Sequence, residues 1–150
     1  MKNISLLLFL FLLSIQTIAQ SIHHKLSMPE PETHYFHVET TLTDFDESSI
    51  VMSLPVWTPG SYLVREFSRH INRVRATDEN GNQLSVDKIR KNKWQITTDK
   101  AKKISIKYEV YAFELTVRTS FLDRTHGYLN GTSVFIYPEG HMDMEGFLTI

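Results

Sequence analysis

Hydrophobic and polar residues alternate along much of the chain, with the period of two that is typical of half-buried β-strands. The alternation is clearest at residues 35–42, and it returns at residues 50–56 after a polar turn at 44–48. Because alternate side chains of a strand point to opposite faces, one of the two sets is expected to lie in a core. The large side chains predicted to be buried in this way are Phe36, Val38, Met52, Leu54, Ile104 and Ile106.

Turn signals separate the remaining predicted strands. Residues 78–81 read Asp-Glu-Asn-Gly, and the Asn-Gly pair readily adopts the positive φ angles of a type I′ hairpin turn. We expect this turn to join a strand at residues 71–77 to another at residues 83–89. Lys91 and Asn92 mark a further tight turn, after which the alternation resumes.

Residues 102–117 are predicted to form the longest strand, and its inward face changes partway along. The apolar side chains lie on one face from Ile104 to Val110 and on the other from Tyr111 to Val117. A bulge, or passage of the strand from one sheet into a second, would produce such a switch. Only residues 61–70 have room for two helical turns. The sequence therefore predicts an all-β fold, an antiparallel β-sandwich.

The first nineteen residues do not follow this pattern. Lys2 precedes an unbroken apolar run at residues 6–13, and small side chains at Thr17 and Ala19 precede Gln20. These features are typical of a secretory signal peptide, and the apolar run is shorter than the roughly 20 residues that span a bilayer. We therefore expect a signal peptide at residues 1–19 rather than an uncleaved, stable membrane anchor. The protein would then be exported to a bacterial periplasm or to the extracellular space.

The mature part, residues 20–150, is predicted to be one domain. Its last residues, 146–150, are apolar and look like the beginning of another strand. This predicts a polypeptide that normally continues beyond Ile150, and the alternative is a terminal strand tucked into the sheet.

Composition excludes several classes of function. The formal net charge is −1, which gives no field that would attract a polyanion, so nucleic acid is not expected as a partner. The chain has no cysteine, so it has no disulfide framework, no thiolate nucleophile and no cysteine-type zinc site.

The histidines do not predict a metal site. His34 and His37 form an H-x-x-H pair, but residues three apart on a strand point to opposite faces. The helical H-E-x-x-H signature of zinc peptidases is absent from the sequence. We therefore expect neither a metal ligand nor a bound cofactor in this chain.

The evidence for a nucleophilic triad is equally weak. Ser120 or Ser133 can be combined on paper with His126 and Asp123, but no G-x-S-x-G turn positions either serine. No catalytic residue is predicted.

Two loop segments stand out. Pro59-Gly60 suits the centre of a type II turn, which would display the rings of Trp57 and Tyr62 side by side. These rings either bind a ligand or seal the end of the sandwich. The second segment, residues 118–131, is polar and rich in glycine and lies between two strands. Loops of this kind on rigid scaffolds often carry function.

Four segments resemble one protein family. They are PEPETHYFHV at residues 29–38, LPVWTPGSYLVREF at 54–67, YEVYAFELTVRTSFLD at 108–123 and HGYLNG at 126–131. Together they resemble the N-terminal domain of the glycyl aminopeptidases, metallopeptidase family sixty-one. In that family a β-rich N-terminal domain precedes a thermolysin-like zinc domain, and the enzymes remove N-terminal residues, preferably glycine or alanine. No zinc ligand or catalytic glutamate of the family has a counterpart in this chain.

The resemblance implies a non-catalytic domain of a secreted zinc metallopeptidase, which shapes the substrate cleft and docks a catalytic domain that this chain lacks. Zinc is expected only in that catalytic domain. The implied partners are the catalytic domain and, through it, the N-terminus of a peptide substrate. The alternative is a free-standing periplasmic module that binds peptide or glycan through Trp57 and Tyr62.

By similarity to the larger zinc aminopeptidases, a loop of the N-terminal domain is expected to form one wall of the cleft. The substrate-cleft candidates are Arg118, His126, Tyr128, Asn130 and Gly131. Tyr128 and Asn130 offer directional hydrogen bonds without adding a charge. Arg118 is expected to order the loop or to pair with an acid of the catalytic domain, because a cation would repel the ammonium group of the substrate.

Overall fold

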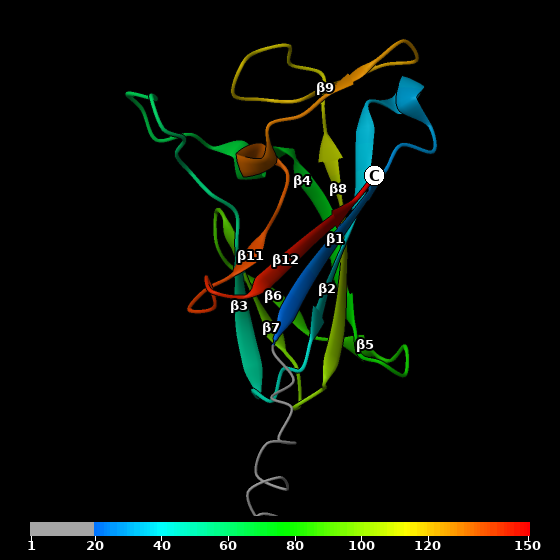
Figure 1. Cartoon of the computed structure of the whole chain (residues 1–150), viewed down its shortest axis with the longest axis vertical. Helices are drawn as coiled ribbons and strands as arrows, with labels where there is room; N and C mark the ends of the chain where they lie inside the picture. Colours follow the sequence, from blue (N-terminus) through cyan, green and yellow to red (C-terminus); the bar gives the residue numbers. More distant parts are fainter. Residues whose placement is uncertain (1–19) are drawn as a thin grey trace, which may run out of the picture.

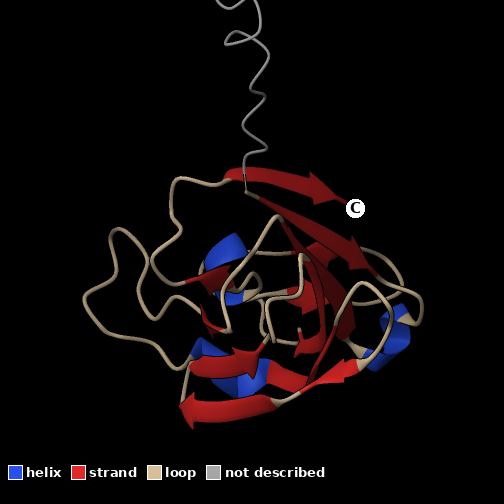
Figure 2. Ribbon diagram, turned by 90° about the horizontal axis from the view of Figure 1, so that it is seen from below, coloured by secondary structure: helices blue, strands red, loops and turns tan. Residues whose placement is uncertain are grey.

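The computed structural model describes residues 20–150, so the predicted signal peptide at residues 1–19 lies outside the described residues. Two β-sheets face each other across a common core, as Figures 1 and 2 show. The larger sheet has the order β12-β1-β2-β8-β4-β5, with bounds Glu145–Thr149, Ser21–Ser27, Tyr35–Thr43, Lys103–Tyr111, Ile71–Thr77 and Gln83–Leu84. The smaller sheet has the order β11-β3-β7-β6, with bounds Tyr137–Pro138, Ser49–Ser53, Lys93–Thr97 and Val86–Arg90.

Short elements lie between and beyond the sheets. A separate two-stranded ribbon consists of β9 (Phe121–Leu122) and β10 (Gly127–Tyr128). Three 3-10 turns are η1 (Pro31–Thr33), η2 (Phe67–His70) and η3 (Gly131–Ser133). Within residues 20–150, no helix is long and apolar enough to cross a membrane.

The predicted all-β sandwich is confirmed. Its neighbouring strands pair antiparallel, except that β12 runs parallel to β1 at the edge of the larger sheet. A parallel pair needs a long connection, and here nearly the whole domain lies between the two strands. The apolar C-terminal residues thus form a strand, as the sequence predicted, but the side chains of β12 are exposed.

The core follows the predicted alternation. The six side chains predicted to be buried are each at most 2% exposed. On β2 the pattern of buried and half-buried residues alternates without a break, and β2 pairs with β8 along its full length. The register places Phe36 opposite Val110 and Leu42 opposite Ile104, so apolar side chains of the two strands share the inner face.

Tyr108 links this sheet to the segment that follows η3. Its buried hydroxyl donates to the carbonyl oxygen of Val134 at 3.0 Å and accepts from the backbone N–H of Ile136 at 3.3 Å. Burial is the main reason that the pKa of the Tyr108 hydroxyl lies above its ordinary value. The neutral Tyr108 hydroxyl therefore fastens residues 134–136, which follow η3, to the larger sheet through two hydrogen bonds.

The prediction of one strand over residues 102–117 is wrong. β8 ends at Tyr111, and the chain turns back, with the N–H of Leu122 donating to the carbonyl of Ala112 at 2.8 Å. Neither a bulge nor a change of sheet explains the switch of apolar face. The apolar residues after Ala112 lie instead on a hairpin that leaves the sandwich.

The hairpin at residues 78–81 is present, but its turn is not type I′. Gly81 has a φ of +83°, whereas Asn80 does not adopt a positive φ. The Asp78 carboxylate accepts from the backbone N–H groups of Asn80 and Asn82 at 2.9 and 2.8 Å, which stabilises a turn with only one left-handed residue.

Two other predicted elements change their extent. The predicted strand at 83–89 divides at Ser85, so that β5 stays in the larger sheet and β6 joins the smaller one. The segment 61–70 forms only the 3-10 turn η2 rather than two helical turns.

Candidate functional site

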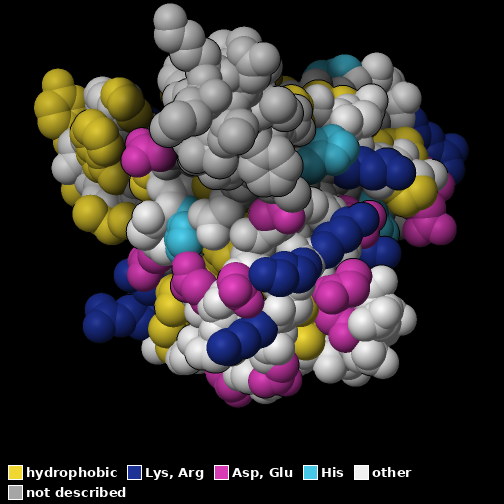
Figure 3. All heavy atoms as spheres, turned by 60° about the horizontal axis from the view of Figure 1, so that its bottom comes forward, with side chains coloured by type: hydrophobic (Ala, Val, Ile, Leu, Met, Phe, Trp, Pro, Cys, Tyr) yellow, Lys and Arg dark blue, Asp and Glu magenta, His cyan; other side chains and the backbone are white. Residues whose placement is uncertain are grey.

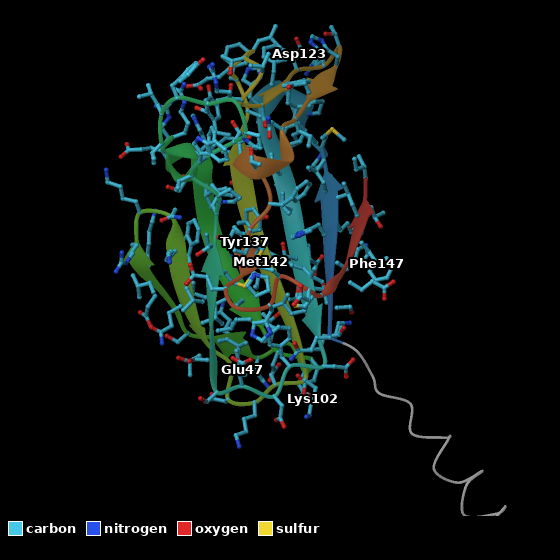
Figure 4. The ribbon with its side chains drawn as sticks, turned by 60° about the vertical axis from the view of Figure 1, so that its left-hand side comes forward. Glu47, Lys102, Asp123, Tyr137, Met142 and Phe147 are labelled. Atoms are coloured by element: carbon cyan, nitrogen blue, oxygen red, sulfur yellow. The ribbon has the colours of Figure 1, made fainter. Side chains whose placement is uncertain are left out.

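Loops gather at one end of the sandwich, and we call residues 54–66 and 112–131 together the loop end. Figure 1 shows both segments at the top of the molecule. In Figure 4, Asp123 lies at this end, whereas Glu47 and Lys102 lie at the opposite one. The two segments adjoin, because a hollow of about 300 Å³ is lined by residues of both.

The first segment contains the predicted type II turn. The N–H of Ser61 donates to the carbonyl of Thr58 at 3.0 Å, and Gly60 at the third position has a φ of +81°. The indole N–H of Trp57 donates to the carbonyl of Ser61 at 2.8 Å, which fixes the ring on the turn.

The two aromatic rings of this turn differ in exposure. Trp57 is half exposed and Tyr62 is fully exposed. Among the aromatic contacts of residues 20–150 there is none between these two rings, so the predicted side-by-side display is not present.

The second segment begins with a hairpin at residues 112–122. Phe113 bridges Phe121, and the N–H of Glu114 donates to the carbonyl of Ser120 at 3.1 Å. The tip is closed by hydroxyls, since Thr116 and Thr119 bond to each other at 2.7 Å. Leu115 and Val117 at the tip are mostly exposed.

Tyr128 and Asn130 hold this tip from the next turn of the chain. The Tyr128 hydroxyl and the Asn130 amide both donate to the carbonyl oxygen of Val117, at 3.3 and 3.0 Å. The amide oxygen of Asn130 also caps η3 by accepting from the N–H and hydroxyl of Thr132. These polar groups are therefore engaged within the domain.

His126 and Asp123 form a tight turn on the outside of the loop end. The Asp123 carboxylate accepts from the hydroxyl and N–H of Thr125 and from the N–H of His126, and these bonds lower its pKa to about 2. The His126 ring bonds to the Thr125 hydroxyl and stacks on Phe121.

The serine, histidine and aspartate side chains considered for a nucleophilic triad do not form one. The hydroxyls of Ser120 and Ser133 are buried and lie 3.2 Å from each other, whereas the exposed His126 ring bonds to Thr125. In the described part of the chain, no group of three or more His, Cys, Asp or Glu side chains is placed to hold a metal ion.

The remaining predicted cleft residues lie nearby. Gly131 is exposed, and its carbonyl accepts from the N–H groups of Val134 and Phe135. Arg118 is half buried and lines the hollow between the two segments. Sequence reasoning missed Arg65, which lines the same hollow from the first segment. It lies in one of the quoted motifs, but nothing in its spacing to Arg118 predicts that they share a hollow.

Exposed apolar surface is concentrated at the loop end. Of the fourteen large apolar side chains that are exposed in residues 20–150, eight belong to this end. They are Trp57, Tyr62, Leu63, Val64, Phe113, Leu115, Val117 and Tyr128. The opposite end of the sandwich differs in character. Figure 3, in which this end is turned forward, shows basic and acidic side chains interspersed on its surface.

Comparison with known proteins places this architecture in a family. Residues 23–150 match the family described as Peptidase M61 N-terminal domain. The chain is also similar to the crystal structure of an aminopeptidase N family protein from Idiomarina loihiensis, at 36% sequence identity and a TM-score of 0.78. That match covers 85% of this chain but only 22% of the Idiomarina chain. A comparison with curated proteins gives no match.

The family assignment covers nearly all of the described residues, and the expected resemblance is confirmed. An N-terminal domain of a peptidase family implies a linked catalytic domain. This chain belongs to the Peptidase M61 N-terminal domain family.

Proposed function

We propose that this chain is the non-catalytic N-terminal domain of a secreted, zinc-dependent aminopeptidase of the glycyl aminopeptidase type. Its loop end docks the linked catalytic domain and forms one wall of the substrate cleft. Zinc belongs to the catalytic domain, and export depends on the signal peptide predicted at residues 1–19. The preference for glycine or alanine follows from the family resemblance.

One observation carries the docking proposal, namely the concentration of exposed apolar side chains at the loop end. A concentration of exposed apolar side chains on one part of a domain commonly marks a surface that contacts a partner. Leu63 and Val64 project from the first segment, and Leu115 and Val117 project from the second. Burying these side chains against a linked domain would stabilise the assembly by the hydrophobic effect.

The cleft wall is proposed to be the hairpin tip rather than a set of side chains that bind substrate directly. Tyr128 and Asn130 use their donors on Val117, so they act as positioning residues for the tip. An aminopeptidase must hold a short substrate beside a metal-activated water, and small displacements of a positioning wall lower the rate. The wall therefore has to be rigid, which the two bonds to Val117 provide.

The alternative, a free-standing module that binds peptide or glycan, has less support. Trp57 would need its indole N–H for a ligand, but this donor bonds to Ser61. Tyr62 stands alone on the turn and does not form an aromatic platform with Trp57.

The proposal is tested by steady-state kinetics of the full-length polypeptide on glycyl and alanyl anilides. The double substitution Leu115→Ser and Val117→Ser should lower kcat/KM by about 10-fold or more, which corresponds to about 1.4 kcal/mol. The matched control is Met142→Ser, which removes an exposed apolar side chain next to His141, whose ring pairs with Glu47 away from the loop end. Equal kcat/KM values for the tip variant and the control would reject the cleft role.

A further inference from the structure

The hollow between η2 and the hairpin tip is rich in arginine. Arg65 and Arg69 line it from the first segment and from η2, and Arg118 lines it from the hairpin. Glu66 and Glu114 are the acidic groups on its wall, and His70 completes the titratable set.

The two acids are already paired. The Glu114 carboxylate lies 2.6 Å from the Arg69 guanidinium, and Glu66 pairs with Lys91. His70 accepts a hydrogen bond from Arg69 at 2.9 Å, and burial is the main reason that its pKa lies below the ordinary value. A neutral His70 adds no positive charge to the hollow, and the charge of Arg69 is balanced by Glu114.

Two guanidinium groups remain without an acid. Neither Arg65 nor Arg118 forms an ion pair with any of residues 20–150. The Nε–H of Arg65 is also buried and has no hydrogen-bond partner within that same range. A buried N–H group without a hydrogen-bond partner destabilises a fold, so buried donors in native proteins nearly always have one.

From these observations we infer that the hollow is a binding site for a carboxylate, and that the occupant is an Asp or Glu side chain of the linked catalytic domain. Two arginines on opposite walls present several N–H donors to one carboxylate, which is the strongest form of charge-assisted hydrogen bonding. The acid would pair with the Arg65 and Arg118 guanidinium groups, neither of which has an acidic partner within residues 20–150. This inference rests on the proposed docking of the loop end.

The surroundings favour a protein carboxylate over a small free one. Val64 lines the hollow, and the exposed Leu63 precedes it in the chain. The exposed Leu115 and Val117 flank Thr116, which also lines the hollow, so its rim is apolar. A docked domain would cover this rim and exclude water from the ion pair, as occurs at the centre of protein interfaces. A free acid or the carboxylate of a short peptide would leave the rim exposed.

The test is calorimetric unfolding of the full-length polypeptide, with a chain that carries Arg118→Glu. Charge reversal should make this domain unfold separately from the catalytic domain. The Tm of this N-terminal domain should fall by about 5 °C or more. Arg118→Gln should produce a smaller shift in the same direction, because the charge is removed rather than reversed. The matched control is Arg75→Glu, an exposed arginine on β4 that forms no ion pair within residues 20–150.

The outcomes separate the two proposals. If the unaltered polypeptide itself unfolds in two independent transitions, docking is absent and both proposals fail. If it unfolds as one unit and Arg118→Glu has no more effect than Arg75→Glu, docking stands and the carboxylate site is rejected. If Arg118→Gln instead raises KM for dipeptides and leaves KM for dipeptide amides and the Tm unchanged, the occupant is a substrate carboxylate and the inference is wrong.

Discussion

Tyr128 and Asn130 donate to the same acceptor, the carbonyl oxygen of Val117. This shared acceptor connects the turn after β10 to the tip of the hairpin that follows β8. The tip has few other attachments to the body of the domain, since Leu115 and Val117 are mostly exposed. The two donors therefore set where the most exposed apolar side chains of the hairpin lie.

Asn130→Ala should destabilise the domain by about 1–2 kcal/mol, because it removes both the bond to Val117 and the side-chain cap of η3. Tyr128→Phe should cost about 0.5 kcal/mol, since its bond is longer and exposed. Urea unfolding of residues 20–150 measures both values, with Gln95→Ala on the exposed face of β7 as the control. An Asn130→Ala domain as stable as the control would mean that the tip does not depend on this side chain.

Leu54→Ala and Ile106→Ala should each lower the free energy of unfolding by about 2–5 kcal/mol, because each leaves a cavity in a fully buried site. Ile89→Ala, which truncates an exposed side chain on β6, should change it by less than about 0.5 kcal/mol. Thermal unfolding of the three variants gives the comparison. A Tm for Leu54→Ala equal to that for Ile89→Ala would contradict the assignment of the core.

Acidification should destabilise the domain through His24. Its ring bonds to the Thr40 hydroxyl at 2.9 Å and packs on Phe135, and burial lowers its pKa from 6.5 to about 4. Between these values the unfolded chain binds a proton that the folded domain excludes, so stability falls as the pH falls. The expected slope approaches about 1 kcal/mol per pH unit between pH 6.5 and about 4.5. Carboxylates contribute mainly below this range.

His24→Gln should flatten that slope, because an amide can keep the bond to Thr40 and does not titrate. Urea unfolding at several pH values measures the slope for both proteins. Identical slopes in the native domain and in His24→Gln would show that another group causes the acid sensitivity.

Sequence alternation predicted much of the sandwich because it reports which side chains share a face. On β2 and β8 that information is sufficient, since both strands stay in one sheet and bury one face throughout. Alternation does not say where a strand ends. Leu115 and Val117 continue the period of β8, but hydrogen bonds among Thr116, Thr119 and Glu114 close a turn there.

Other features depend on contacts that are distant in the chain. Ser85 divides β5 from β6, and only the positions of β4 and β7 decide which sheet each piece joins. Arg65 and Arg118 are far apart in the sequence, and the fold alone places them in one hollow. Of the candidate site, the sequence indicated the region 118–131 and the type II turn, but it did not indicate that Tyr128 and Asn130 bond to Val117.

The central claim is that the loop end faces the catalytic domain, and site-directed crosslinking in the full-length polypeptide tests it most directly. Because residues 1–150 contain no cysteine, Val117→Cys introduces a single attachment point in this domain for a photo-crosslinker. The account predicts crosslinked peptides between position 117 and the catalytic domain, and none from the matched variant Lys102→Cys, an exposed position at the opposite end of the sandwich. Crosslinks from position 102 but not from position 117 would contradict it.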